Sequence, residues 1–220
     1  RLIAKEVVQW FRSQHVSAIL VACNTTNSLA FDVVQRDADV PVLGLIKSTE
    51  AMITETRVGV LATSATTSSS AYKFHIQSLC PGTIVFEQPC PAFVPMIEAG
   101  QLSGPSMQRT AIQYLNPLLD EQVQAIVLGC SHYPLLQPLL QELIPNNVRL
   151  IDPAIGLANQ LDQLLGPPKP SISRRPLISN TRFCVTSDPT KFATQISNWF
   201  GHRPEVKLVS LLPQACFFYD

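Results

Sequence analysis

The stretch AIVLGCSHYPLLQPLL, residues 125–140, carries the pattern that decides the fold. Its first five residues have no polar side chain, and Cys130, Ser131 and His132 follow at once. Pro134 then turns the chain into an apolar segment of helical length. A short apolar run bounded by turn signals is typical of a strand buried on both faces of a parallel sheet. The stretch therefore predicts a buried strand followed by a helix, with a thiol where the strand stops.

The same alternation of short apolar runs and helix-length segments continues along the chain. The expected strands are rich in Val, Ile and Leu and lack polar alternation, as strands covered on both faces should. They span residues 18–23, 41–46, 57–63, 83–88, 125–130, 148–152, 182–187 and 205–211. Helices are expected at about residues 1–14, 25–36, 66–79, 105–119, 134–144, 153–165 and 189–200. This order predicts an α/β fold with mostly parallel sheets, and the proline-rich segment 166–181 is expected to be a loop or linker.

The composition is that of a globular enzyme and gives no sign of nucleic-acid or membrane binding. Apolar residues make up 46% of the 220 residues and charged ones 15%, which argues against disorder. Sixteen basic residues balance sixteen acidic ones, so no electrostatic footprint for nucleic acid or an anionic membrane is present. No apolar run approaches the length of a membrane span. We therefore expect neither partner.

The six cysteines lie far apart without the tight spacing of a disulfide framework or a zinc site. In a chain of this size they are expected to be free thiols of a reducing compartment, which favours a cytoplasmic location. The chain begins RLIAKEVVQWF, without Met and already inside an amphipathic pattern. We therefore expect an N-terminal piece of the protein to precede it.

Two of the cysteines share one position relative to the predicted strands and helices. AILVACNTTNSLAF and AIVLGCSHYPLLQPLL are each an apolar strand, a Cys, two hydrogen-bonding residues and an apolar helix. The first gives Cys23-Asn24-Thr25 and the second gives the Cys130 turn. Open α/β sheets bind ligands beyond the carboxyl ends of their strands, where helix N-termini offer free N–H groups. A thiol there is expected to have its pKa lowered by the helix dipole.

Two thiols on separate segments suit two-base proton transfer at a carbon acid. One thiolate removes a proton from one face of the substrate, and the other thiol returns one to the opposite face. Such a reaction inverts a stereocentre and needs no cofactor, provided that hydrogen-bond donors stabilise the carbanion. His132 is placed either to tune the thiol of Cys130 or to contact charged groups of the substrate.

Other readings of these residues are weaker. A zinc site is not expected, because Cys130 and His132 are two residues apart and no second close pair completes a set. A Cys–His hydrolase is disfavoured, because a His two residues from its Cys usually does not turn back onto it. The four remaining cysteines, Cys80, Cys90, Cys184 and Cys216, are interpreted as ordinary buried thiols. His15, His75 and His202 are interpreted as surface or helix-end residues.

The hydroxyl-rich stretch LATSATTSSSAY, residues 61–72, also follows a predicted strand. Two interpretations stay open: its hydroxyls bind a carboxylate or phosphate at a helix N-terminus, or they form an N-cap and a solvated surface. It lacks the P-loop pattern, and no Gly-x-Gly-x-x-Gly fingerprint of a dinucleotide site occurs in the chain.

With both thiol turns in view, the chain resembles the glutamate racemases of the cofactor-independent aspartate/glutamate racemase superfamily. VACNTTNS is similar to the family's Ala-Cys-Asn-Thr-Ala turn, and LGCSHYPLL to its Gly-Cys-Thr-His-Tyr-Pro turn. PVLGLI, VGVLATSATTSSSAY, LIDPA and TSDPTKF extend the resemblance over essentially the whole chain. The second turn is the specific part, because related aspartate racemases carry an acidic residue in place of the His.

The resemblance implies an isomerase that interconverts L- and D-glutamate and supplies D-glutamate for peptidoglycan. Cys23 and Cys130 would be the two proton donors and acceptors, on opposite faces of the glutamate Cα. The substrate-binding residues implied by the same matches are Asn24, Thr25, Thr63, Thr66, Ser131 and His132. The resemblance implies no cofactor and no metal, with glutamate as the small-molecule partner. Dimers are common in the family, which makes a homodimer the candidate assembly.

The family's fold implies two doubly wound, mostly parallel-sheet α/β domains with the active site between them, one cysteine from each. Carried over to this chain, residues 1–47 and 153–220 would form a discontinuous first domain that is incomplete at its N-terminus. Residues 48–152 would form the second domain.

The chain departs from the family's pattern at several places. An Asp-Ser-Gly strand end and a Pro-Tyr-Gly turn, whose residues assist the first cysteine and contact substrate in the family, do not occur in this sequence. Ser131 replaces Thr and keeps the hydroxyl, and Thr26 replaces Ala. Two alternatives therefore remain: a racemase of aspartate or a related acid, against which His132 argues, and an inactive truncated paralogue that serves as a binding module.

Overall fold

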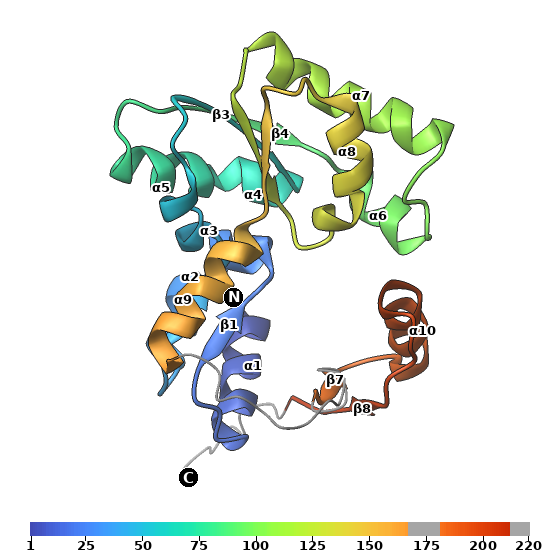
Figure 1. The fold of residues 1–220 in the computed structure, drawn as a ribbon. Helices are drawn as coiled ribbons and strands as arrows, with labels where there is room; N and C mark the ends of the chain where they lie inside the picture. The colour runs from blue at the N-terminus through green and yellow to red at the C-terminus, as the bar shows by residue number, and fades with distance from the viewer. Residues whose placement is uncertain (167–180, 212–220) are drawn as a thin grey trace.

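A computed structural model describes residues 1–166 and 181–211 (Figure 1). All the strands expected from the sequence are present. The strands are β1 (Ile19–Val21), β2 (Val42–Gly44), β3 (Arg57–Ala62), β4 (Ile84–Pro89), β5 (Ala125–Gly129), β6 (Arg149–Ile151), β7 (Phe183–Val185) and β8 (Val206–Leu208). All but β4 are shorter than their predicted runs. Most of the predicted loop or linker at 166–181 lies outside the described residues, as does Cys216.

Helical structure is present at every expected position, although the segment expected as one helix at 134–144 begins as a 3-10 turn and becomes α-helical at Gln137. The α-helices are α1 (Leu2–Ser13), α2 (Asn24–Asp37), α3 (Leu45–Ser48), α4 (Ser64–Ser69), α5 (Ala71–Leu79), α6 (Phe93–Glu98), α7 (Pro105–Asp120), α8 (Gln137–Leu143), α9 (Pro153–Leu165) and α10 (Pro189–Phe200). Two 3-10 turns are η1 (Glu50–Met52) and η2 (Tyr133–Leu136). None of the helices in the described ranges combines the length and the apolar character that crossing a membrane requires.

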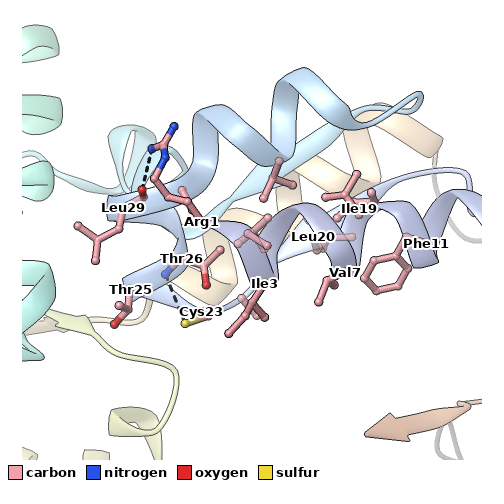
Figure 2. A pocket seen from close by; sticks show the side chains of 16 residues that line it. Arg1, Ile3, Val7, Phe11, Ile19, Leu20, Cys23, Thr25, Thr26 and Leu29 are labelled. Atoms are coloured by element: carbon pink, nitrogen blue, oxygen red, sulfur yellow. Dashed lines mark hydrogen bonds between the residues drawn. The ribbon is translucent and has the colours of Figure 1, made fainter. Parts of the chain in front are cut away.

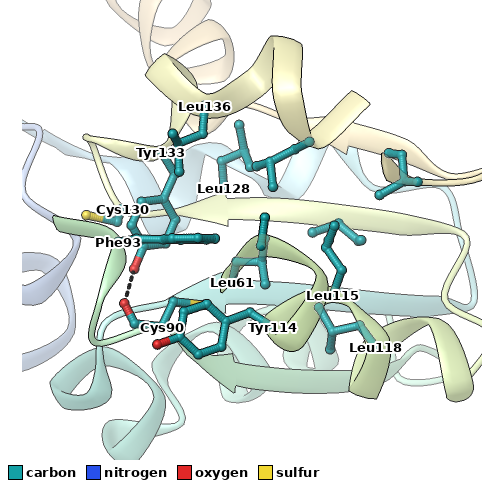
Figure 3. Packing of buried hydrophobic residues seen from close by; sticks show 14 of the residues in the cluster. Leu61, Cys90, Phe93, Tyr114, Leu115, Leu118, Leu128, Cys130, Tyr133 and Leu136 are labelled. Atoms are coloured by element: carbon teal, nitrogen blue, oxygen red, sulfur yellow. Dashed lines mark hydrogen bonds between the residues drawn. The ribbon is translucent and has the colours of Figure 1, made fainter. Parts of the chain in front are cut away.

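The largest sheet has four parallel strands in the order β4-β3-β5-β6. Along β3, Val58, Val60 and Ala62 point to one face and pack with Tyr72 and other residues of α5. Leu61 points to the other face, which α6, α7 and α8 cover, as Figure 3 shows for part of that core. Successive side chains of a strand alternate between faces, so a strand that is apolar throughout needs cover on both sides. This explains why the middle strands are continuous apolar runs, and it confirms the α/β class with parallel sheets.

The first part of the chain forms a second, smaller parallel pair, β1 with β2. Val8 of α1 and Val34 of α2 are buried against Ile19 and Val21 of β1. The chain returns to this region at α9, which packs against α3 so closely that a Cβ on Gly156 would lie 2.2 Å from the carbonyl oxygen of Ser48. The division into domains 1–47 plus 153–220 and 48–152 stays a prediction.

The last described elements form a third parallel pair, β7 with β8, beside α10. Asp188 caps α10 by accepting a hydrogen bond from the Lys191 N–H, and Asp152 caps α9 in the same way from Ala154. Both helices have Pro at their first position, where its missing N–H costs nothing.

Three local expectations need correction. The run 41–46 is not strand throughout, because α3 begins at Leu45 directly after Gly44. The helix expected at 66–79 is two helices, α4 and α5, separated at Ser70, whose φ of 53° lies in the left-handed region. The short helix α6 was not expected, since Pro95 lies within it. Each of these features depends on one or two residues, which a hydrophobic period over ten or more residues does not resolve.

Candidate active site

Cys23 lies between β1 and α2 and is the N-cap of that helix. Its backbone is extended, and its Sγ accepts a hydrogen bond of 3.4 Å from the N–H of Thr26 in the first turn. The side chain is exposed. Figure 2 shows Cys23 with Thr25 and Thr26 at one end of a cavity of about 440 Å³ between α1, β1 and α2, which is otherwise mainly apolar. The sulfur is therefore both reachable from solvent and held at the positive end of a helix.

Asn24 is the first residue of α2 and, unlike Cys23, is buried. Its Oδ1 accepts a hydrogen bond of 2.6 Å from the hydroxyl of Tyr72 on α5. Its Nδ2 is buried without a hydrogen-bond partner among the described residues. A buried amide normally has partners at both ends, so this N–H₂ group, next to a candidate catalytic thiol, is free to donate one further hydrogen bond.

Three threonine hydroxyls join the start of α2 to the start of α4. Thr25 Oγ1 lies 3.1 Å from Thr63 Oγ1 and 3.5 Å from Thr66 Oγ1, and the last two lie 3.0 Å apart. Thr63 caps α4 by accepting a hydrogen bond from the N–H of Thr66. The N-cap interpretation of the hydroxyl-rich stretch is confirmed for Thr63, and the binding of a carboxylate or phosphate by its hydroxyls stays a prediction. Thr63 is an N-cap, and its hydroxyl also faces a residue from the Cys23 turn.

Cys130 directly follows β5 and is 7% exposed. The turn after it is closed by a hydrogen bond of 3.0 Å from the N–H of Tyr133 to the Cys130 carbonyl. The Tyr133 hydroxyl donates a hydrogen bond to the Cys90 carbonyl, drawn as a dashed line in Figure 3. This turn places Nδ1 of His132 3.9 Å from the Cys130 sulfur. The expectation that this His does not turn back onto its Cys is therefore wrong. Ser131 lies exposed between them.

His132 is held by two residues that the sequence analysis did not single out. Its Nε2 lies 3.4 Å from Oε1 of Glu98, the last residue of α6. Its ring meets the indole of Trp199 on α10 edge to face, with 6.1 Å between the ring centroids. Glu98 follows an apolar helix and Trp199 lies within an amphipathic one, so neither carries a local signal of this role.

The pKa of the Cys130 thiol is raised, mainly because the side chain is buried. The hydrogen bond from the His132 backbone opposes this shift, and the charge of Cys23 adds to it. The expectation of a lowered pKa is therefore wrong for Cys130. Its turn leads into a 3-10 segment rather than the first turn of a long helix, and desolvation outweighs the dipole.

Thr63 and Cys130 lie at one edge because they follow neighbouring strands of one parallel sheet. The Cys23 turn follows a strand of the other sheet and is joined to them by the contact of Thr25 with Thr63. Cys23 follows β1, Thr63 follows β3 and Cys130 follows β5, and β3 and β5 are direct neighbours. Loops at the carboxyl ends of parallel strands emerge at the same edge of a sheet. The structure thus brings together the residues predicted from sequence around the two thiols, with Ser131 exposed at the rim.

The other described cysteines have structural surroundings. Cys90 is 1% exposed, burial raises the pKa of its thiol, and its Sγ contacts the Gln88 carbonyl at 3.4 Å. Cys80 and Cys184 are partly buried outside the site. Among residues 1–166 and 181–211, no three His, Cys, Asp or Glu side chains come close enough together to hold a metal ion.

Comparisons with known proteins agree on one family. A model of the Asp/Glu/Hydantoin racemase family matches residues 1–161. The glutamate racemase of Synechococcus sp. strain CC9605 is 54% identical over 215 residues, which cover 97% of this chain and 81% of that protein. The glutamate racemase of Prochlorococcus marinus strain NATL2A is 44% identical over 95% of this chain and 79% of its own length.

Comparison with solved structures indicates the same family. Glutamate racemase from Francisella tularensis in complex with D-glutamate superimposes with a TM-score of 0.85 at 33% identity, over 95% of this chain and 79% of that one. The enzyme from Thermus thermophilus in complex with beta-chloro-D-alanine gives a TM-score of 0.80 at 32% identity, over 96% of this chain and 79% of that one. The chain belongs to the Asp/Glu/hydantoin racemase family, within its glutamate racemase branch.

Proposed function

We propose that this enzyme interconverts L- and D-glutamate by two-base proton transfer at Cα, with Cys23 and Cys130 as the two bases. The observation that carries the proposal is the pairing of the thiols. They follow two different strands, at carboxyl ends where parallel sheets bind ligands. Thr25 of the Cys23 turn contacts Thr63, which follows β3, the direct neighbour of the strand that leads to Cys130. The similarity to curated glutamate racemases and to a structure that contains D-glutamate supports glutamate as the substrate.

The reaction needs one thiolate and one thiol. The thiolate takes the Cα proton from one face of glutamate, which leaves a carbanion whose charge spreads into the α-carboxylate. The opposite thiol then gives its proton to the other face, and the enantiomer forms. No electrons are exchanged, and the two sulfurs have swapped protonation states, so solvent must reset them before the next turnover in the same direction.

Burial of Cys130 suits it to the donor role at neutral pH, because a raised pKa keeps the sulfur protonated. Exposed Cys23, which accepts an N–H at the start of α2, is suited to the base role in the same direction. In the reverse direction the roles exchange, and the thiolate of Cys130 is helped by the His132 ring 3.9 Å away.

The polar groups beside the thiols supply the donors that bind and stabilise the substrate. The unpaired Nδ2 of Asn24 and the hydroxyls of Thr25, Thr63 and Thr66 serve the side of the site with Cys23. Ser131 and His132 serve the side with Cys130. Preorganised donors of this kind are what a carbanion with charge on carboxylate oxygens requires.

The biological setting follows the same reasoning. We propose a cytoplasmic enzyme that supplies D-glutamate for peptidoglycan, that works as a homodimer, and that binds neither nucleic acid nor membrane. The balance of 16 basic against 16 acidic residues supports the last point. The proposed site lies between the two predicted domains, 1–47 with 153–220 and 48–152.

Racemisation and solvent exchange test the proposal together. Purified protein is incubated with L-glutamate or D-glutamate in D₂O, and chiral chromatography with mass spectrometry follows inversion and deuterium at Cα. Cys23→Ala and Cys130→Ala are each expected to lose racemisation by at least about 10³-fold, since each removes a proton carrier. Cys184→Ala, which removes a thiol on β7 outside the site, is the matched control and should racemise normally.

The outcomes separate the alternatives. Racemisation by either single thiol variant at the control's rate would overturn the two-thiol assignment. Turnover of aspartate in preference to glutamate would assign the substrate to a related acid. Binding of glutamate without exchange or inversion in the unmodified protein would favour a binding module.

A further inference from the structure

Tyr72 connects the helix that covers the four-stranded sheet to the turn that carries Cys23. It lies on α5, is fully buried, and packs with residues of β3 and β5 such as Val60 and Val127. Its hydroxyl reaches out of this apolar cluster and donates a hydrogen bond of 2.6 Å to Oδ1 of Asn24. The tyrosine is 48 positions from its acceptor in the sequence.

The hydrogen bond fixes which end of the Asn24 amide is free. Burial raises the pKa of Tyr72, and the charges of Cys130 and Asp152 raise it further, so the phenol keeps its proton. A protonated hydroxyl needs an acceptor, and the amide oxygen of Asn24 supplies one. The amide N–H₂ therefore points away from Tyr72.

This N–H₂ group is buried next to the Cys23 turn without a partner. Asn24 is 2% exposed, and its Nδ2 has no hydrogen-bond partner among the described residues. Leaving a buried donor unpaired is costly, so such groups persist mainly where a ligand completes them. Its neighbour in the chain is Cys23, so the ligand that we assign to this N–H₂ group is the substrate whose Cα proton the Cys23 sulfur transfers.

We infer that Tyr72 is a positioning residue that holds the Asn24 amide with its N–H₂ group toward a carboxylate of the substrate beside Cys23. The inference rests on the proposed function and deepens it, because it names what orients a binding group. Tyr72 itself does not touch the substrate. Its hydroxyl acts through Asn24 alone, and its ring completes the core beneath the site.

Loss of the hydroxyl has a specific consequence at Asn24. The terminal torsion of an Asn side chain is soft and roughly two-fold, so an amide without its anchor populates both orientations. In the flipped orientation the carbonyl oxygen faces the substrate carboxylate and repels it. Phenylalanine at position 72 keeps the packing of the ring, so the substitution removes mainly the hydrogen bond from the Tyr72 hydroxyl to Asn24.

The first experiment compares Tyr72→Phe with Tyr114→Phe. Tyr114 is a matched control, because it is buried on α7 and its hydroxyl also makes one hydrogen bond, from the N–H of Ala92. We expect Tyr72→Phe to lower kcat/KM about tenfold for both enantiomers, mainly through a higher KM, because ground-state binding is lost. The control should stay within about twofold of the unmodified enzyme.

A double-mutant cycle separates positioning from simple destabilisation. Asn24→Ala removes the group that Tyr72 orients, so adding Tyr72→Phe to it should lower kcat/KM by less than about twofold more. Multiplicative losses in the double variant would overturn the inference, as would a Tyr72→Phe variant that matches the Tyr114→Phe control. An unmodified enzyme that fails to racemise glutamate would instead refute the proposed function.

Asn24→Asp keeps the inference testable if Tyr72→Phe does not fold. An aspartate accepts the Tyr72 hydrogen bond but has no N–H to donate, so we expect KM for glutamate to rise more than tenfold while the variant stays folded by circular dichroism. A folded Asn24→Asp variant with unchanged KM would show that no N–H from this position reaches the substrate.

Discussion

The imidazole Nε2 of His132 lies 3.4 Å from Oε1 of Glu98, while Nδ1 of the same ring lies 3.9 Å from the sulfur of Cys130. A carboxylate at one ring nitrogen favours a proton there and leaves the other nitrogen to interact with the thiol. The indole of Trp199 packs against the same ring at nearly a right angle. Two consecutive contacts, from Glu98 to His132 and from His132 to Cys130, thus connect the end of α6 to a proposed catalytic sulfur.

Removal of the charge from Glu98 should weaken catalysis without unfolding the protein. We expect Glu98→Gln to lower kcat about two- to fivefold, because the contact of a half-exposed carboxylate with the imidazole is worth about 0.5–1 kcal/mol. Steady-state kinetics measured with both enantiomers check this, with Glu142→Gln, an exposed glutamate of α8, as the control. An equal effect in the two variants would show that the contact of Glu98 with His132 does not contribute to catalysis.

Alkylation should distinguish the two thiols. Cys23 is exposed, whereas Cys130 is 7% exposed and has a raised pKa. Because the thiolate is the reactive form, iodoacetamide at pH 8 should modify Cys23 at least about tenfold faster than Cys130. Peptide mass spectrometry over time gives both rates. The rate at Cys130 should still be rising above pH 9, and a plateau below that pH would contradict the raised pKa.

Glu87 on β4 should make the protein less stable as pH rises. Burial raises the pKa of Glu87 from 4.5 to about 7, against an opposing effect of Lys73, and its Oε1 is buried without a partner among the described residues. The folded state therefore holds a proton that the unfolded state releases. Its contribution is complete below pH 4.5 and is lost as pH rises through about 7.

Glu87→Gln removes this dependence. We expect the variant to be more stable than the unmodified protein at pH 8 by about 1 kcal/mol, a figure reduced for the partial exposure of the side chain. Near pH 4.5 the two proteins should differ little. Urea unfolding at the two pH values measures the change, and a difference independent of pH would show that Glu87 titrates normally.

The packing of α9 on α3 should tolerate no side chain at Gly156. A Cβ there would lie 2.2 Å from the carbonyl oxygen of Ser48, whose hydroxyl also donates to the Pro153 carbonyl. We expect Gly156→Ala to destabilise the protein by about 2 kcal/mol, although alanine favours the helix itself. Gly82→Ala, where a Cβ would meet nothing within 4 Å, is the control for thermal melting. Equal melting temperatures in the two variants would refute the close approach.

Much of this protein was predictable from local sequence. The run Ala125–Gly129 is a buried strand because five apolar residues leave no polar face for solvent, and its neighbours along the chain obey the same rule. Asp152 with Pro153 and Asp188 with Pro189 mark helix starts through chemistry confined to one turn. Features that depend on a single residue, such as the break at Ser70, were missed because a period needs several residues to appear.

The residues of the proposed site also fall into those that the sequence could identify and those that it could not. Cys23 and Cys130 were identifiable because a thiol after an apolar strand and before polar residues is a local pattern, repeated twice. Tyr72, Glu98 and Trp199 were not identifiable, because each acts on a residue that is distant in the chain.

The sequence by itself determined the order of strands and helices and the two turns at which thiols emerge, because apolar runs, prolines and capping residues act over a few positions. Only the tertiary structure decided the state of those thiols. The pKa of Cys130 is raised rather than lowered because burial depends on how α6, α7 and α8 close over the sheet. The orientation of the Asn24 amide depends on a phenol that reaches it only after folding.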